Sequence, residues 1–575
     1  MKHLLIASLL LSRLLACENI SGVFNTTADN NAKKAEVVAI PPRDLSVTSD
    51  NSYSDLFLDS AVIEYYIKSE NIIDSAAQNI RHFYNARNYQ FAWFNSEGFT
   101  EQGKGFWSLY EYTNKEGEAG ATLQDKDLKK AMDTLAEKDT LFVNTSDSAF
   151  FKTELALTNQ FLAFAAREKH EQEVFADPYL FVPVKRIDPM IWADSVLNGQ
   201  KSGDTSSSTM PYNLLKEQLG KYYEAEKKGG WAPVHLTGKT FKKGESAAVI
   251  AAIKKRLIQS GDLAGADSSQ AFDEPFALAI TSYKLRHGFD SMETITDSLI
   301  TEMNVSSRER IQQIIINMNR MRWMPAINGE NLIEVNIPAF MLNVYEGASK
   351  VFDMKVVVGK EGSNTMMFSG DMDQIVFSPY WNIPASIVKE EIMPAIKTNS
   401  NYLKQHNMEV VKNNDSLPTI RQLPGGANSL GKVKFLFPNS YDIFLHDTPA
   451  KELFEKDQRA FSHGCIRLHD AEKMAAYLLR DDKNWTPDKI NNAMESKKEQ
   501  WVKLNKAVPV MITYFTAWVD KDGKINFRND VYGHDQKTSS RMFAVNTHNL
   551  PQESQQHKDS SQSNSSIINA TKKGA

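Results

Sequence analysis

The spacing of apolar residues divides this chain into a helical first half and a strand-rich second half. Between 53 and 238, apolar residues recur at intervals of three and four, as at Ile72, Ala76, Ile80 and Phe83, which predicts amphipathic helices. From about residue 331 the pattern changes to short β-branched and aromatic runs separated by Gly, Pro and Asn, which is typical of strands. The pattern therefore predicts a multidomain α+β protein with a helical scaffold over 53–238 and a β-rich domain over 331–535.

A smaller helical unit is predicted between these two regions, at 239–305. One apolar face includes Ile253, and a second ends at Tyr283. A linker at 306–330 begins with a helix after Ser306. Within the β-rich region, 384–430 interrupts the strands with a helical and then loop-like insertion. After it we expect a helix from Ala471 to Leu479 and a hairpin with its turn at Asp522 and Gly523.

The two ends of the chain have a different composition. Residues 1–16 combine a basic start with a short leucine-rich run, which is the form of a secretory signal. Residues 17–52, rich in Asn, Thr, Ser, Ala and Asp, predict a flexible tether, and 536–575, rich in Ser, Gln, Asn and Lys, predict a disordered tail. The aromatic cluster at Tyr84–Phe94 is expected to be core rather than a binding surface.

Charge and cysteine content narrow the possible functions. A chain of 575 residues is too long for a single core, and a net charge of −5 argues against a nucleic-acid partner. The chain has only two cysteines, Cys17 and Cys465. A lone thiol in an exported protein is an oxidation liability, so its presence favours a use in chemistry.

The surroundings of Cys465 indicate nucleophilic chemistry. A cysteine that attacks a carbonyl needs a base, and N–H donors to receive the oxyanion. His446 ends a predicted strand and can supply the base. Ser462, His463 and Gly464 precede the thiol, and the glycine lets backbone N–H groups approach a reacting carbonyl. Arg467 follows, where its guanidinium can bind a substrate carboxylate or fix the loop. Two alternatives remain: a buried structural cysteine, and a zinc site formed by His446, His463 and Cys465, although no CxxC or HxxxH spacing supports it.

The order HDTP and then SHGCIR resembles the catalytic motif of the L,D-transpeptidases, the cysteine enzymes of the YkuD-like fold that cross-link peptidoglycan. The further runs PYWNIP, RQLPGG to LGKVKF and YDIFLHDTP are similar to the large periplasmic YcbB-like branch of that family. The resemblance implies a β-sandwich catalytic domain over 331–535, in which Cys465 is the nucleophile and His446 the general base and acid. The resemblance also implies that backbone N–H groups near Gly464 and Cys465 hold the oxyanion, with support from Ser462, His463 and Arg467.

The same resemblance makes 384–430 a cap over the active site, with Trp381 and Tyr441 lining the substrate pocket, although Trp381 is equally well explained as core. Thr365 and Met366 stand where the family commonly has Thr-Pro, and this difference is expected to have no catalytic meaning. No cofactor and no metal are expected. Acylation of Cys465 by carbapenems is implied.

Two other segments resemble known modules. Leu14 to Cys17 resembles a lipobox, which implies lipidation of Cys17 and a membrane-anchored periplasmic lipoprotein of a Gram-negative bacterium, although Arg13 departs from the pattern and an ordinary signal remains possible. Residues 239–305 resemble the peptidoglycan-binding helical module. The run FDSMETIT departs from that module's pattern, so a purely structural three-helix unit remains the alternative.

The expected function is peptidoglycan L,D-transpeptidation that forms 3→3 cross-links between tetrapeptide stems, in a monomer. The same site could instead act as an L,D-carboxypeptidase, or attach a lipoprotein to the wall. A wall-binding anchor without catalysis is the alternative from another class.

Overall fold

The computed structural model describes residues 40–114, 125–136, 148–168, 181–198, 210–236, 240–325, 331–412 and 417–544. The chain separates into two compact units, Met1–Pro41 and Pro42–Ala575, and all the helices and strands described lie in the second. The signal segment, Cys17 and residues 545–575 lie outside the described residues. None of the helices in the described ranges is long and apolar enough to cross a membrane.

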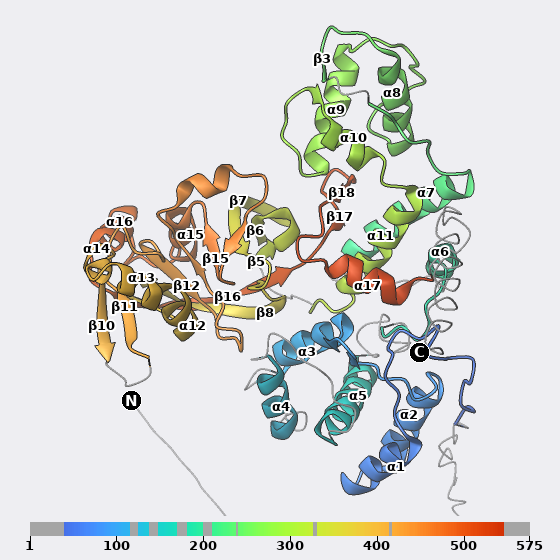
Figure 1. The fold of residues 1–575 in the computed structure, drawn as a ribbon, viewed down its shortest axis with the longest axis horizontal. Helices are drawn as coiled ribbons and strands as arrows, with labels where there is room; N and C mark the ends of the chain where they lie inside the picture. Colours follow the sequence, from blue (N-terminus) through green and yellow to red (C-terminus); the bar gives the residue numbers. More distant parts are fainter. Residues whose placement is uncertain are drawn as a thin grey trace, which may run out of the picture. The chain divides into compact units, whose positions relative to one another are not determined.

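The N-terminal region is helical, as the apolar spacing predicts (Figure 1). Its core is aromatic: Phe83, Tyr84, Phe91, Trp93 and Phe94 have no exposed surface, which confirms that the aromatic cluster is core. The elements of this region are α1 (Ser60–Ser69), α2 (Asp74–Asn85), β1 (Phe94–Asn95), β2 (Gly98–Phe99), α3 (Glu101–Thr113), α4 (Lys126–Ala136), α5 (Ser148–Glu168), α6 (Pro189–Asn198) and α7 (Met210–Lys227).

The tether predicted for 17–52 ends earlier than expected. Val47 is fully buried, the Asp44 N–H donates to the carbonyl of Asn85 at 2.9 Å, and Ser52 forms a β-bridge with Lys185. These contacts hold 42–52 against the scaffold, so the prediction of a flexible segment is wrong for these residues. The polar composition of this segment suggested a flexible chain. Backbone pairing and the burial of one valine hold it in place, and neither requires many apolar residues.

The small module at 240–304 has the expected three helices, α8 (Ala248–Ser260), α9 (Glu274–Arg286) and α10 (Asp297–Met303), and a short pairing of β3 (Phe241–Lys242) with β4 (Thr294–Ile295). Ile253 and Tyr283 are both fully buried in its core, which confirms the two predicted apolar faces.

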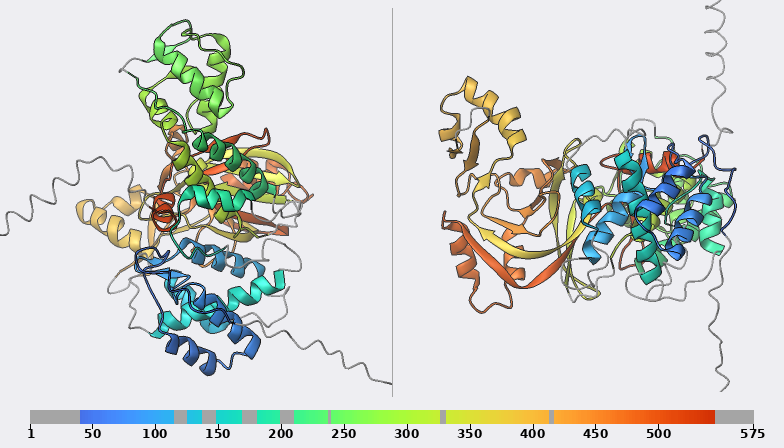
Figure 2. Two further views of the ribbon diagram at one scale, coloured as in Figure 1. Left: turned by 90° about the vertical axis from the view of Figure 1, so that its right-hand side faces the viewer. Right: turned by 90° about the horizontal axis from the view of Figure 1, so that it is seen from below.

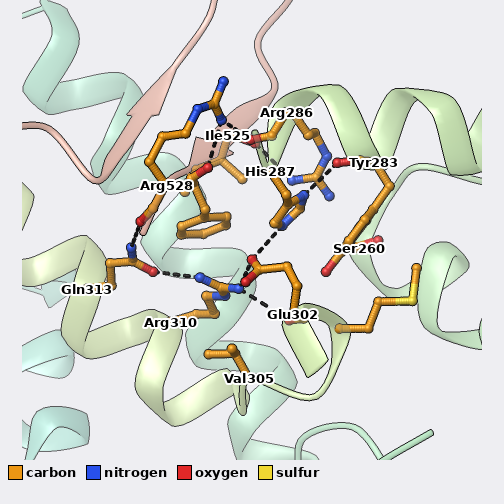
Figure 3. Close-up of polar contacts among 12 residues, drawn as sticks. Ser260, Tyr283, Arg286, His287, Glu302, Val305, Arg310, Gln313, Ile525 and Arg528 are labelled. Carbon is orange, nitrogen blue, oxygen red and sulfur yellow. Dashed lines mark hydrogen bonds and ion pairs between the residues drawn. The ribbon is translucent and has the colours of Figure 1, made fainter. Parts of the chain in front are cut away.

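Hydrogen bonds attach this module to a C-terminal hairpin formed by β17 (Ala517–Val519) and β18 (Ile525–Phe527) (Figure 3). Arg286 donates to the Ile525 carbonyl at 2.8 Å, and Arg528 donates to the Arg286 carbonyl at 2.8 Å. Gln313 of α11 (Ser307–Met321) donates to the Arg528 carbonyl at 3.2 Å. The expected linker helix, α11, therefore also contacts the hairpin. A capping box formed by Ser306 and Glu309 begins this helix.

The strand-rich region is built on one nine-stranded sheet, with the order β14-β7-β15-β13-β12-β8-β16-β5-β6. A further pairing of β6 with β7 closes the sheet on itself around an apolar core. The prediction of a β-rich domain is confirmed, and one closed sheet stands where we expected a sandwich. Its strands are β5 (Asn331–Asn336), β6 (Met341–Glu346), β7 (Ser349–Gly359), β8 (Phe368–Phe377), β12 (Val433–Leu436), β13 (Leu445–His446), β14 (Ala460–Ser462), β15 (Ile466–Leu468) and β16 (Gln500–Thr513).

The insertion at 384–430 has its own apolar cluster, which includes Ile387, Ile392 and Ile420. Figure 2 shows its elements as one group, in yellow and light orange. Its second part was expected to be loop-like but contains a hairpin whose strand β11 also pairs with β9. The insertion follows β9 (Trp381–Asn382), and its elements are α12 (Ala385–Ile387), a π-helical turn (Val388–Ile392), α13 (Met393–Thr398), α14 (Tyr402–Gln405), β10 (Met408–Lys412) and β11 (Thr419–Gln422).

The last elements are α15 (Ala471–Leu478), α16 (Pro487–Glu495), the β17–β18 hairpin and α17 (His534–Met542). Helix α15 confirms the helix predicted from Ala471 to Leu479, and the β17–β18 hairpin confirms the turn predicted at Asp522 and Gly523. Helix α17 contradicts the disordered tail predicted from 536, because Met542 and Phe543 are buried and Arg320 of α11 forms an ion pair with Asp535 at 2.6 Å. Few apolar residues suffice here because a buried arginine fixes the helix.

Glu154 of α5 is a carboxylate in the aromatic core. It accepts hydrogen bonds from the N–H groups of Ala92 at 2.6 Å and Trp93 at 3.0 Å, and from the Tyr84 hydroxyl at 3.0 Å. Burial nevertheless raises the pKa of Glu154 to about 7.

We therefore expect the Glu154→Gln variant to differ from the parent in how its stability depends on pH. The folded parent binds the Glu154 proton more tightly than the unfolded chain, so this contribution is complete below about pH 4.5 and is lost as the pH rises through 7. Urea unfolding at pH 5 and pH 8 should show the parent losing about 1–3 kcal/mol relative to the variant. Parallel pH profiles would contradict the assignment.

Candidate active site

The pairing of three neighbouring strands places three basic side chains in one row. Lys434 of β12 lies directly opposite His446 of β13, and His446 lies beside Arg467 of β15. Cross-strand partners share a face of the sheet, so these side chains lie together. The alternate residues Phe435, Leu445 and Ile466 are fully buried in the core on the other face.

Cys465 lies in the short loop between β14 and β15, two residues before Arg467. Its thiol is partly buried and lies 3.7 Å from the carbonyl oxygen of Asp442, to which it can donate a hydrogen bond. Burial raises the pKa of Cys465 to about 11, although Arg467 and Lys434 act in the opposite direction. The thiol is therefore protonated at neutral pH.

His446 is only 4% exposed, and its Nδ1 lies 2.5 Å from the carbonyl oxygen of Asp447. A carbonyl only accepts hydrogen bonds, so Nδ1 carries the proton and Nε2 keeps its lone pair. Burial, followed by the charge of Arg467, lowers the pKa of His446 to about 4. The imidazole is therefore neutral, with Nε2 able to accept a proton. The hydrogen bond of the thiol is to the Asp442 carbonyl and not to the imidazole.

The loop before Cys465 is held by two hydroxyl groups. Ser462 Oγ donates to the Cys465 carbonyl at 2.5 Å and accepts the Gly464 N–H at 3.2 Å. Thr365 Oγ1 donates to the Gly464 carbonyl at 2.7 Å and accepts the Gly359 N–H at 2.9 Å. Gly464 has a φ of 116°, which a residue with a side chain rarely adopts. The Gly464 N–H is thus already engaged, and of the two predicted oxyanion donors the N–H of Cys465 is the better candidate.

His463 contacts the insertion at 384–430 rather than the thiol. It is exposed, and its Nε2 lies 3.0 Å from Glu391 Oε1 in the π-helical turn. This contact joins the insertion at 384–430 to the motif loop. It does not support the zinc alternative, and the described part of the chain contains no group of three or more His, Cys, Asp or Glu residues able to hold a metal ion.

Arg467 is partly buried, and its buried Nε has no hydrogen-bond partner within the described residues. Burial lowers the pKa of the guanidinium, which remains charged at neutral pH. This arginine can still offer a hydrogen bond to a ligand.

The two predicted pocket residues have other contacts. Trp381 lies in β9 and packs against the apolar cluster of the cap. The ring of Tyr441 lies 5.3 Å from that of Phe368, and burial and the carboxylates of Glu111 and Asp133 raise its pKa. The core interpretation of Trp381 fits this packing, and Tyr441 belongs to the contact between the sheet and the scaffold.

Sequence reasoning missed Lys434, Thr365 and Asp447. Thr365 was expected to have no catalytic meaning, but its hydroxyl bridges Gly359 and Gly464 in the motif loop. Lys434 could be found only through the pairing of β12 with β13. Asp447 accepts the Lys432 N–H at 3.0 Å and pairs with Lys451 at 2.8 Å, which fixes the residue after His446.

The protonation states predict how alkylation of Cys465 by iodoacetamide depends on pH. With a pKa of about 11, the thiolate fraction and the rate should rise about tenfold per pH unit from pH 7 to 10. Peptide mass spectrometry that follows Cys465 alone measures this rate. A midpoint below pH 8 would instead indicate a resting thiolate beside a protonated imidazole.

We expect Thr365→Val to slow the reactions of Cys465 about 10-fold or more while the fold persists, because valine keeps the shape but leaves the Gly359 N–H and the Gly464 carbonyl without their partner. Thr365→Ser keeps the hydroxyl and is the matched control. The rate at which Cys465 reacts in each variant measures the effect, and circular dichroism checks that each variant remains folded. Equal rates for the valine variant and the parent would contradict the positioning role.

Comparisons with known proteins match two parts of the chain. Residues 330–510 match the model of the L,D-transpeptidase catalytic domain of the YkuD family, and 78–219 match a scaffold domain. A protein from Haemophilus influenzae that is described as a putative L,D-transpeptidase is 28% identical to this chain over 290 residues. The aligned region covers 48% of this chain and 57% of that protein. The chain thus spans little more than half the length of this curated relative.

Two solved structures also match. The chain is similar to an L,D-transpeptidase from Mycobacterium smegmatis, at 12% identity over 32% of this chain and 58% of that one, with a TM-score of 0.19. It is also similar to one from Stackebrandtia nassauensis, at 14% identity over 49% of this chain and 95% of that one, with a TM-score of 0.18. We draw nothing further from such low scores. The matched segment includes both Cys465 and His446, and residues 330–510 match the L,D-transpeptidase catalytic domain of the YkuD family.

Proposed function

We propose that this protein is a peptidoglycan L,D-transpeptidase that forms 3→3 cross-links through a thioester at Cys465. The observation that carries the proposal is the convergence of a thiol, a neutral imidazole and a guanidinium in one stretch of an L,D-transpeptidase domain. Strands β13 and β15 pair so that His446 lies beside Arg467, two residues after Cys465.

In the first half of the proposed reaction, Cys465 attacks the carbonyl of the third residue of a donor stem. His446 Nε2 takes the thiol proton as the bond between sulfur and carbon forms. The negative charge then lies on the carbonyl oxygen, which the Cys465 N–H can stabilise. Collapse breaks the peptide bond, His446 returns its proton to the amine of the leaving D-alanine, and a thioester remains.

In the second half, the side-chain amine of a neighbouring stem's diamino acid attacks the thioester. His446 accepts a proton from that amine and gives it to the departing sulfur, so that the free thiol is restored. The reaction consumes no water. In this proposal the cap at 384–430 excludes water from the thioester. The contact of His463 with Glu391 supports a position of the cap beside the motif loop.

The location is a proposal drawn from sequence alone. A lipid on Cys17 would hold the catalytic domain at a membrane of a Gram-negative periplasm, within reach of the wall. The same resemblance supports acylation of Cys465 by carbapenems. Residues 239–305 are proposed as a peptidoglycan-binding module.

The test is the mass of the products formed from tetrapeptide stems. The parent should release D-alanine and give a dimer, whereas Cys465→Ala should give neither while remaining folded. Release of D-alanine without a dimer would indicate a carboxypeptidase instead, and dimer formation by Cys465→Ala would remove the thiol from the mechanism.

The His446→Ala variant should lose about 10²- to 10⁴-fold in rate, because the general base is absent. His469→Ala is the matched control, since His469 is an exposed histidine in the same region. Full activity of the His446 variant would exclude this residue as the base.

A further inference from the structure

We propose that Lys434 binds the terminal carboxylate of the donor stem and so selects peptides that end in a free acid. This inference rests on the proposed function, because it assigns a recognition role beside the proposed nucleophile.

The position of Lys434 follows from the register of the sheet. Lys434 pairs with His446 on one side and with Val376 on the other, and Val376 in turn pairs with Trp501 of β16. These partners share one face of the sheet, and adjacent strands lie about 4.8 Å apart. Lys434 therefore flanks His446 on the side opposite Arg467, and Trp501 lies further along the same row.

The ammonium group has no acidic partner of its own. Within the described part of the chain, Lys434 has neither an ion pair nor a side-chain hydrogen bond, and its Nζ lies 5.7 Å from the ring centre of Phe444 and 5.5 Å from that of Trp501. The nearby carboxylate of Glu499 already accepts the Tyr380 N–H at 3.0 Å and the Trp501 indole N–H at 3.1 Å.

Lysine is an unusual choice for such a position, because removing an ammonium group from water is unfavourable without a partner. Lys434 is partly buried, and burial lowers its pKa. A bound carboxylate would supply the missing partner. Trp501 is 57% exposed, so its ring leaves an open apolar wall beside the ammonium group.

The donor offers a carboxylate in the right place. The terminal acid of the stem belongs to the residue that follows the attacked carbonyl, and consecutive Cα atoms are about 3.8 Å apart. A cation next to the base and nucleophile can therefore reach that acid while the thiol reaches the carbonyl. The methyl group of a terminal alanine could then lie against Trp501.

The experiment compares binding of two tetrapeptides that differ only at the C-terminus, one a free acid and the other a carboxamide. Binding is measured by calorimetry in the Cys465→Ala background, so that the result does not depend on turnover. The acid should bind about 10- to 100-fold more tightly than the amide. Adding Lys434→Met should abolish that difference, and Lys434→Arg should keep most of it.

Lys432→Met is the matched control, because it removes a positive charge two residues away that is paired with Glu495. It should leave the preference for the acid intact. The proposal is overturned if the acid and the amide bind equally to the Cys465→Ala protein, or if Lys434→Met weakens both peptides by the same factor.

With intact Cys465, turnover and alkylation separate recognition from an effect on the thiol. Lys434→Met should raise KM for the acid by a larger factor than it lowers kcat, and the pH midpoint of Cys465 alkylation should rise only slightly, because Arg467 lowers the pKa of the thiol more than Lys434 does. A large shift of that midpoint with unchanged KM would assign Lys434 to thiol activation and overturn the proposal. If the parent shows no turnover but the Cys465→Ala protein still binds the acid more tightly than the amide, the result counts against the proposed function and not against the role of Lys434.

Discussion

The register between β12, β13 and β15 is the constraint on which the candidate site depends. Side chains alternate between the two faces of a strand, so a shift of one residue would exchange the core residues for the basic row. Leu445 and Ile466 are fully buried in the closed sheet, and their burial fixes the position of His446 and Arg467 on the other face. The strand register that buries the core residues is therefore the same register that places the candidate catalytic side chains.

Electrostatics around that row favour a neutral resting pair. Burial raises the pKa of the Cys465 thiol to about 11 and lowers that of His446 to about 4, and both shifts disfavour a charged pair. The neighbouring cations still favour negative charge once it forms on sulfur or oxygen. The recognition proposed for Lys434 would place the carbonyl of a bound stem beside the protonated thiol, which links it to the chemistry proposed for Cys465.

Much of the fold could be predicted from periodicity alone, because buried faces repeat every two residues in strands and every 3.6 in helices. Helix α11 and the helices α8 and α9 of the module were predicted in this way. Helix α17, the packed segment 42–52 and the β10–β11 hairpin were missed, because a few buried residues, backbone pairing and one ion pair stabilise polar sequences that composition assigns to loops.

The site was predicted to the extent that its residues are close in sequence. Cys465, His446 and Arg467 lie within one motif region and could be identified together. Lys434 and Thr365 reach the same place through strand pairing and through a hydrogen bond to Gly464, and neither can be read from local sequence. The contacts of His463 with Glu391 and of Tyr441 with Phe368 could not be predicted for the same reason, since these partners are distant in the chain.

The most direct measurement of the central claim is intact-protein mass spectrometry of the protein after incubation with a carbapenem, beside the Cys465→Ala variant. The account predicts that the parent gains the mass of one opened carbapenem and that the variant gains none. An adduct on both proteins, or on neither, would contradict the assignment of Cys465 as an acylable nucleophile in a working L,D-transpeptidase site.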